Sequence, residues 1–164
     1  TYLATSNNQA EALRLKGSTY FRLGLLKQAK DQYLLAHQYE LNTVQKAKIL
    51  LDIAEISIMK GEYNDVIKTL NKLENRDWIP GDRASNSIRC LDLYLSIAAK
   101  YMLNQNIKDE QATLEEYTKT NTLTGWSYTT FDKWIDREDN GLSHSQKKFL
   151  SSLTASMKNR TRSY

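Results

Sequence analysis

The chain has 164 residues, of which 40% are hydrophobic and 26% are charged, with one Pro, six Gly and one Cys. A single cysteine excludes an internal disulfide framework and any multi-thiolate metal site, and two distant histidines leave little for a histidine metal site. So few turn residues argue against an all-β sandwich or barrel. These numbers leave an all-α fold open, and we expect no metal and no cofactor.

Location is predicted from the apolar runs and the first residues. No apolar run approaches the ~20 residues that a membrane helix needs, so we expect no membrane partner. Residues 1–9 are polar and lack the apolar core of a signal peptide. The predicted location is cytoplasmic, and the absence of an initiator Met favours a piece cut from a larger protein.

The net charge of +4 is unevenly distributed along the chain. Five basic residues and no acidic residue follow Leu142; they are Lys147, Lys148, Lys158, Arg160 and Arg162. Such a tail predicts either contact with phosphates or a solvated helix end, where the helix dipole favours cations. We favour the solvated end.

Apolar residues recur at helical spacing through almost the whole chain, as in the series Ile49, Ile53 and Ile56. Short turns between the helices predict antiparallel neighbours. The helices are expected near residues 8–23, 26–40, 43–60, 63–75, 85–104, 107–119, 129–137 and 143–158.

A spaced pattern of small and aromatic residues marks the first two predicted helices. Its members are Gly17, Tyr20, Gly24, Ala29, Tyr33 and Ala36. Small residues let two helices approach closely, with Ala29 expected opposite Gly17, and Gly24 falls where the chain must reverse. With these residues the chain resembles the tetratricopeptide repeat (TPR) family, whose units are helix–turn–helix pairs of about 34 residues. Lys16 and Leu41 depart from the family pattern.

The pattern returns 37 residues later as Ala54, Ser57, Gly61, Val66, Leu70 and Leu73. A weaker third copy lies a further 44 residues along, with Ala98, Tyr101, Gln105, Leu114 and Tyr117, while Glu110 replaces a small residue. The resemblance implies a right-handed α-solenoid of TPR-like helix pairs at about 8–41, 43–75 and 85–119. Residues 120–164 would then form an aromatic-rich linker and a closing helical hairpin with the basic tail.

An aromatic cluster follows the third pair and comprises Trp126, Tyr128, Phe131 and Trp134. It predicts either a stacking platform for bases or, as we favour, an apolar face that docks the closing hairpin onto the third pair. Thr129 or Thr130 is expected to cap the short helix that follows. Ser143 and Gln146 have the spacing of a capping box, which starts the last helix.

No convergent group of catalytic residues is evident in the sequence. His37 and His144 are expected on helix surfaces rather than as general bases, and Cys90 as a small core residue rather than a redox thiol. Adjacent acids such as Glu115 and Glu116 do not share a helix face. Phosphate-loop, dinucleotide-binding and zinc-protease motifs do not occur. We therefore expect no enzymatic activity.

The resemblance also implies a concave groove lined by the first helix of each pair. In the first two pairs the projected lining is Arg14, Ser18, Phe21, Arg22, Lys48, Asp52, Glu55 and Met59. In the third pair it is Asp92, Leu95, Ser96, Ala99 and Met102, unless the C-terminal helices cover that end. Phe21 is the expected anchor, and Arg14 and Lys48 would favour an acidic partner segment.

The expected function is protein–protein recognition by a TPR-like module, as one domain of a larger signalling or regulatory protein. The alternative is a nucleic-acid-binding domain that uses the basic tail and the aromatic cluster. The two differ in salt dependence, because affinity for nucleic acid falls steeply as salt rises.

Overall fold

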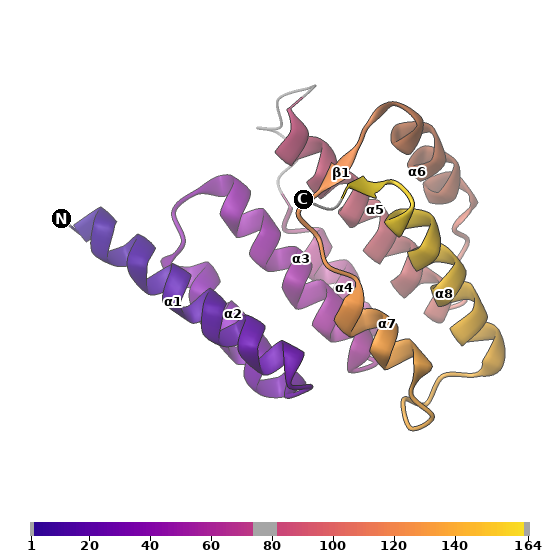
Figure 1. Cartoon of the computed structure of the whole chain (residues 1–164), viewed down its shortest axis with the longest axis horizontal. Helices are drawn as coiled ribbons and strands as arrows, with labels where there is room; N and C mark the ends of the chain where they lie inside the picture. The colour runs from indigo at the N-terminus through magenta and orange to yellow at the C-terminus, as the bar shows by residue number, and fades with distance from the viewer. Residues whose placement is uncertain (1, 74–81, 163–164) are drawn as a thin grey trace. The chain divides into compact units, whose positions relative to one another are not determined.

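The segments with helical spacing form eight α-helices within the described residues of the computed structural model (Figure 1). The structure describes residues 2–73 and 82–162. By contact, the chain divides into unit 1, Thr1–Glu74, and unit 2, Asn75–Tyr164. Unit 1 holds α1 (Tyr2–Arg22), α2 (Leu26–Tyr39), α3 (Thr43–Met59) and α4 (Tyr63–Leu70). Unit 2 holds α5 (Arg83–Met102), α6 (Lys108–Thr120), β1 (Leu123–Thr124), α7 (Thr129–Asp136), α8 (His144–Lys158) and β2 (Thr161–Arg162).

Each predicted helix has a counterpart, so the all-α class is confirmed. The helix α1 begins at Tyr2 rather than at residue 8, and α4 ends at Leu70, whereas its predicted end at residue 75 lies outside the described residues. The contacts group the third helix pair with the closing segment in unit 2. The repeat pattern instead groups this pair with the first two.

A two-bond turn ends α1. The N–H of Gly24 donates to the carbonyl of Phe21 at 3.0 Å, and the N–H of Leu25 donates to the carbonyl of Tyr20 at 2.9 Å. Gly24 has a φ of 75°, in the left-handed region that a side chain disfavours. Glycine at this position therefore lets the chain reverse into α2, as the sequence predicts.

The same turn ends α3 and α5. Gly61 has a φ of 74° and Asn104 a φ of 56°. At the third turn, Asn104 and Gln105 donate to the carbonyls of Tyr101 and Lys100 at 3.0 and 2.9 Å. Asn is the residue that, after Gly, best tolerates this conformation. The third reversal therefore lies at Asn104, one residue before the predicted position, Gln105.

In unit 1, α1 packs along α2, and both α2 and α4 pack on α3. A Cβ at position 17 would lie 3.2 Å from ring atoms of Tyr33, so Gly17 lets the two helices approach closely. The atoms nearest to such a Cβ belong to Tyr33, which lies one turn further along α2 than Ala29, the buried residue predicted opposite Gly17. The helix α3 is buried along most of its length, from Ala47 to Met59.

In unit 2, the elements α6, α8 and β1 all pack on α5. Tyr94 of α5 is fully buried and meets the rings of Tyr128 and Phe131 edge-on, with centroids 5.9 and 6.2 Å apart. Its hydroxyl also shares a hydrogen bond of 2.9 Å with Thr154 of α8. The predicted docking role of the aromatic cluster is thus confirmed for Tyr128 and Phe131.

A short parallel pairing joins the end of the described chain to the segment after α6. Leu123 pairs with Thr161 and Thr124 with Arg162. The Leu123 side chain is 1% exposed, so the pairing also encloses an apolar group. This part of the basic tail is therefore a strand, where a solvated helix end was predicted.

Two predicted helix starts have different outcomes. At α8 the Gln146 N–H donates to Ser143 Oγ at 3.2 Å, and the Ser143 N–H donates to Gln146 Oε1 at 2.8 Å, which confirms the capping box. At α7 the prediction of a threonine cap is wrong. The helix begins at Thr129 after Tyr128, whose side chain makes no capping hydrogen bond.

Candidate functional site

A polar cluster in unit 1 gathers side chains from α1, α2 and α3 around the hydroxyl of Tyr33 (Figure 1 shows the helices). The side chain of Ser18 and the charges of Asp52, Glu55 and Arg14 all act on this hydroxyl. Burial, with the nearby Asp52 carboxylate, raises the pKa of Tyr33, so the hydroxyl stays protonated. The structure thus brings together predicted groove residues from both α1 and α3.

Asp52 is the charge-determining member of this cluster. Burial raises the pKa of its carboxyl to about 7, although Arg14 and Lys48 both act to lower it. The carboxyl is therefore only partly ionised at neutral pH. Arg14 and Lys48 thus act on one side of α1 and α3, where Asp52 and Glu55 are the acidic members of the cluster.

The other predicted residues of this surface differ in exposure. Phe21 is half-buried and Arg22 is exposed. Glu55 and Met59 are buried, at 2% and 9% exposure. Phe21 and Arg22 therefore offer side-chain surface, whereas Glu55 and Met59 belong to the interior of the folded chain.

The projected third part of the groove lies on α5 in unit 2. Leu95 and Ala99 are fully buried there, so they offer no surface. Asp92 is half-buried beside Arg89, at 3.7 Å, and burial raises the pKa of its carboxyl to about 6. Ser96 and Met102 are half-buried. The candidate site is therefore limited to the polar cluster of unit 1.

The spacing pattern assigns Tyr33 to helix packing and does not predict its central place in this cluster. A buried tyrosine hydroxyl needs a hydrogen-bond partner. The polar Ser18 and Asp52, at inward positions of the neighbouring helices, were the available signal.

The basic tail makes contacts within unit 2. Lys158 pairs with Asp132, the Arg160 guanidinium donates to Thr118 Oγ1, and the Lys147 ammonium donates to the carbonyl of Arg137 at 2.6 Å. Lys148 is exposed. Three of the five basic groups therefore already have partners in the protein.

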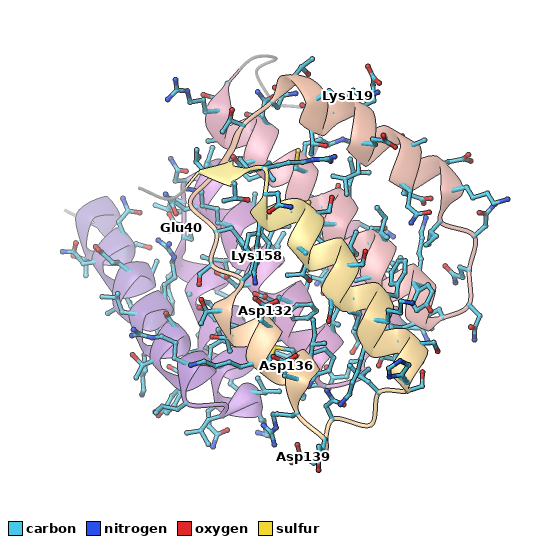
Figure 2. The ribbon with its side chains drawn as sticks, turned by 45° about the vertical axis from the view of Figure 1, so that its right-hand side comes forward. Glu40, Lys119, Asp132, Asp136, Asp139 and Lys158 are labelled. Atoms are coloured by element: carbon cyan, nitrogen blue, oxygen red, sulfur yellow. The ribbon has the colours of Figure 1, made fainter. Side chains whose placement is uncertain are left out.

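Trp126 lines an open cleft of about 530 Å³ beside α7 and the end of α8. Its indole N–H is buried with no hydrogen-bond partner among the described residues. Figure 2 shows that Asp132 and Asp136 lie in the same region as Lys158. These carboxylates would repel phosphates, and the rings of Phe131 and Trp134 are buried, so both features count against the nucleic-acid alternative.

The titratable groups considered as catalysts occupy ordinary helical sites. Burial of His37, with the charges of Lys46 and Lys72, lowers its pKa. His144 is exposed at the start of α8. Cys90 is fully buried, and burial raises the pKa of its thiol to about 11, which keeps it protonated.

No group of three His, Cys, Asp or Glu side chains within residues 2–73 and 82–162 is placed to hold a metal ion. Among the helices in this described part of the chain, none is both long enough and apolar enough to cross a bilayer. Comparison with the profiles of known protein families, with curated proteins and with solved structures gives no match to this chain.

Proposed function

We propose that the chain is a non-catalytic, TPR-like interaction module that binds an acidic peptide segment of a partner protein on the α1–α3 side of unit 1. The proposal includes a right-handed solenoid arrangement of its helix pairs and a place within a larger signalling or regulatory protein. The recurrence of one turn geometry at Gly24, Gly61 and Asn104 supports a repeated helix-pair unit.

The observation that carries the proposal is the placement of Arg14 and Lys48 around Asp52. Two cations from different helices flank one carboxyl that is only partly ionised, so an acidic side chain of a partner can pair with these cations. A peptide that lies across both helices can contact both cations at once. Charge complementarity of this kind sets specificity and the rate of association.

Phe21 supplies the apolar part of the proposed surface. It lies on α1 one turn beyond Ser18 and is half-buried. A few aromatic or arginine side chains usually carry most of the binding energy of an interface. The preferred ligand is therefore a segment with acidic residues next to one large apolar residue.

The test is selection of binders from a random peptide display library, followed by titration of the selected peptides. We expect acidic sequences, and affinity should fall about tenfold or more in Arg14→Glu/Lys48→Glu. The matched control is Lys27→Glu/Lys68→Glu, which changes net charge equally at side chains that are 80% and 77% exposed. Equal losses in the two double variants, with folding verified by circular dichroism, would contradict the proposal.

A further inference from the structure

A second candidate site lies in unit 2, in a groove between α6 and α8, which both pack on α5. Figure 2 shows the two helices side by side, with Lys119 marking α6 and Lys158 marking α8. The groove has a volume of about 240 Å³. This is below the size of most sites for drug-sized ligands but sufficient for one ring with a short chain.

The groove has an apolar side and a polar side. Its apolar lining comes from Leu114 of α6 and from Phe149 and Leu153 of α8. The Phe149 ring is held in place because it stacks on Tyr101 at a centroid distance of 3.7 Å. Ser152 lines the same groove, so a hydroxyl group lies beside the apolar surface.

Arg160 also lines this groove and is half-buried. Its guanidinium donates to Thr118 Oγ1. Within the described part of the chain, the ion pairs leave Arg160 without a carboxylate partner. A half-buried charge without a counterion is unfavourable, and a guanidinium has two parallel donors that match a carboxylate. The groove therefore combines a fixed cation with an apolar surface of limited size.

We propose that this groove binds a small organic acid, with the carboxylate on Arg160 and a short apolar body on Leu114, Phe149 and Leu153. The proposal is independent of the partner surface in unit 1. Glu115 lies on the α6 wall of the same groove and is exposed, so its charge would repel a bound carboxylate. Removing its charge should favour an acidic ligand and would weaken a basic one.

The probe is 3-phenylpropionate, and the neutral control is 3-phenylpropan-1-ol. We expect the acid to shift amide NMR signals of α6 and α8 in a saturable manner, about tenfold more tightly than the alcohol. Glu115→Gln should tighten binding of the acid, and Arg160→Gln should remove its advantage over the alcohol. Equal affinity for both probes in the parent, or weaker binding of the acid in Glu115→Gln, would overturn the proposal.

Two adjacent serines locate the site. Ser152 lines the groove, whereas the neighbouring Ser151 is exposed and lies outside it. Ser152→Phe should fill the groove and abolish binding of 3-phenylpropionate, and Ser151→Phe should bind it as the parent does. Because both are exposed positions on α8, each variant should keep its fold. Retained binding in Ser152→Phe would place the acid elsewhere and overturn the assignment.

Discussion

At the scale of single residues, Asp52 shows how a carboxyl can oppose folding. Its pKa in the folded protein, about 7, lies above the ordinary value of 3.8. The folded state therefore binds a proton that the unfolded state has already released between these pH values. Stability consequently falls as pH rises from about 4 to 7 and stays lower above that range.

Asp52→Asn should therefore stabilise the protein at pH 8 and leave its stability nearly unchanged at pH 4. Melting temperatures from circular dichroism at the two pH values test this. Asp65→Asn is the control, because it makes the same chemical change at an exposed position of α4. An equal effect of Asp52→Asn at both pH values would mean that its carboxyl is not the group that titrates.

Gly17 controls the approach of α1 to α2. Gly17→Leu should destabilise unit 1 by about 1–3 kcal/mol or more, because even an added Cβ would lie 3.2 Å from the Tyr33 ring. Urea unfolding measures the loss. Lys27→Leu, at an exposed position in the first turn of α2, should change stability little. If both variants unfold at the same urea concentration, α1 and α2 do not approach closely at Gly17.

Phe21 distinguishes a binding anchor from a core residue. Phe21→Ala should cost less stability than Phe131→Ala, because Phe21 is half-buried whereas Phe131 is 0% exposed. Loss of a core phenylalanine costs about 3–5 kcal/mol. The same Phe21→Ala variant should weaken binding of a selected acidic peptide by about 2 kcal/mol or more. A stability loss equal to that of Phe131→Ala, with unchanged peptide affinity, would assign Phe21 to the core.

At the scale of elements, the helices were predictable because their apolar residues repeat at 3.6-residue spacing over many turns. The third turn was misplaced by one residue, since a glycine marks the first two reversals and Asn104 replaces it in the third. The pairing of β1 with β2 could not be predicted. Each strand has two residues, too few to show alternation, and the partners are far apart in the sequence.

The third turn can be tested where sequence and structure differ. Asn104→Val should destabilise unit 2 by about 1–2 kcal/mol, because a β-branched residue is strained at a φ of 56°. Asn104→Gly should be neutral or stabilising. Gln105→Val, at the position that the sequence predicted, should have little effect on the melting temperature. A larger loss of stability in Gln105→Val than in Asn104→Val would place the turn at Gln105, as the sequence predicted.

At the scale of the whole molecule, the sequence predicted the fold class and the helix order, and the candidate site only in part. The resemblance to the TPR family placed Arg14, Ser18, Lys48 and Asp52 at groove positions of two helices. It could not show that Tyr33 joins them, because that contact depends on how three helices pack. Similarly, the charge pattern predicted a solvated tail, although most of its basic groups have partners inside unit 2.

Deletion of residues 160–164 tests the structural role of the tail. It removes the Arg160–Thr118 contact and the strand that pairs with Leu123. Exposure of Leu123 alone should cost about 1.5–3 kcal/mol. We therefore expect a lower melting temperature in calorimetry, with the charge-neutralised Lys148→Gln as the control. An unchanged melting temperature would support the solvated tail that the sequence predicted.

The pairing of Leu123 with Thr161 also sets an order for folding during synthesis. Unit 1 makes its helix contacts between neighbours in the sequence, so it can fold once residue 73 has left the ribosome. Unit 2 must close a loop that contains both α7 and α8 before β1 gains its partner. Until residue 162 emerges, the apolar surface around Leu123 remains open to chaperones and to other nascent chains.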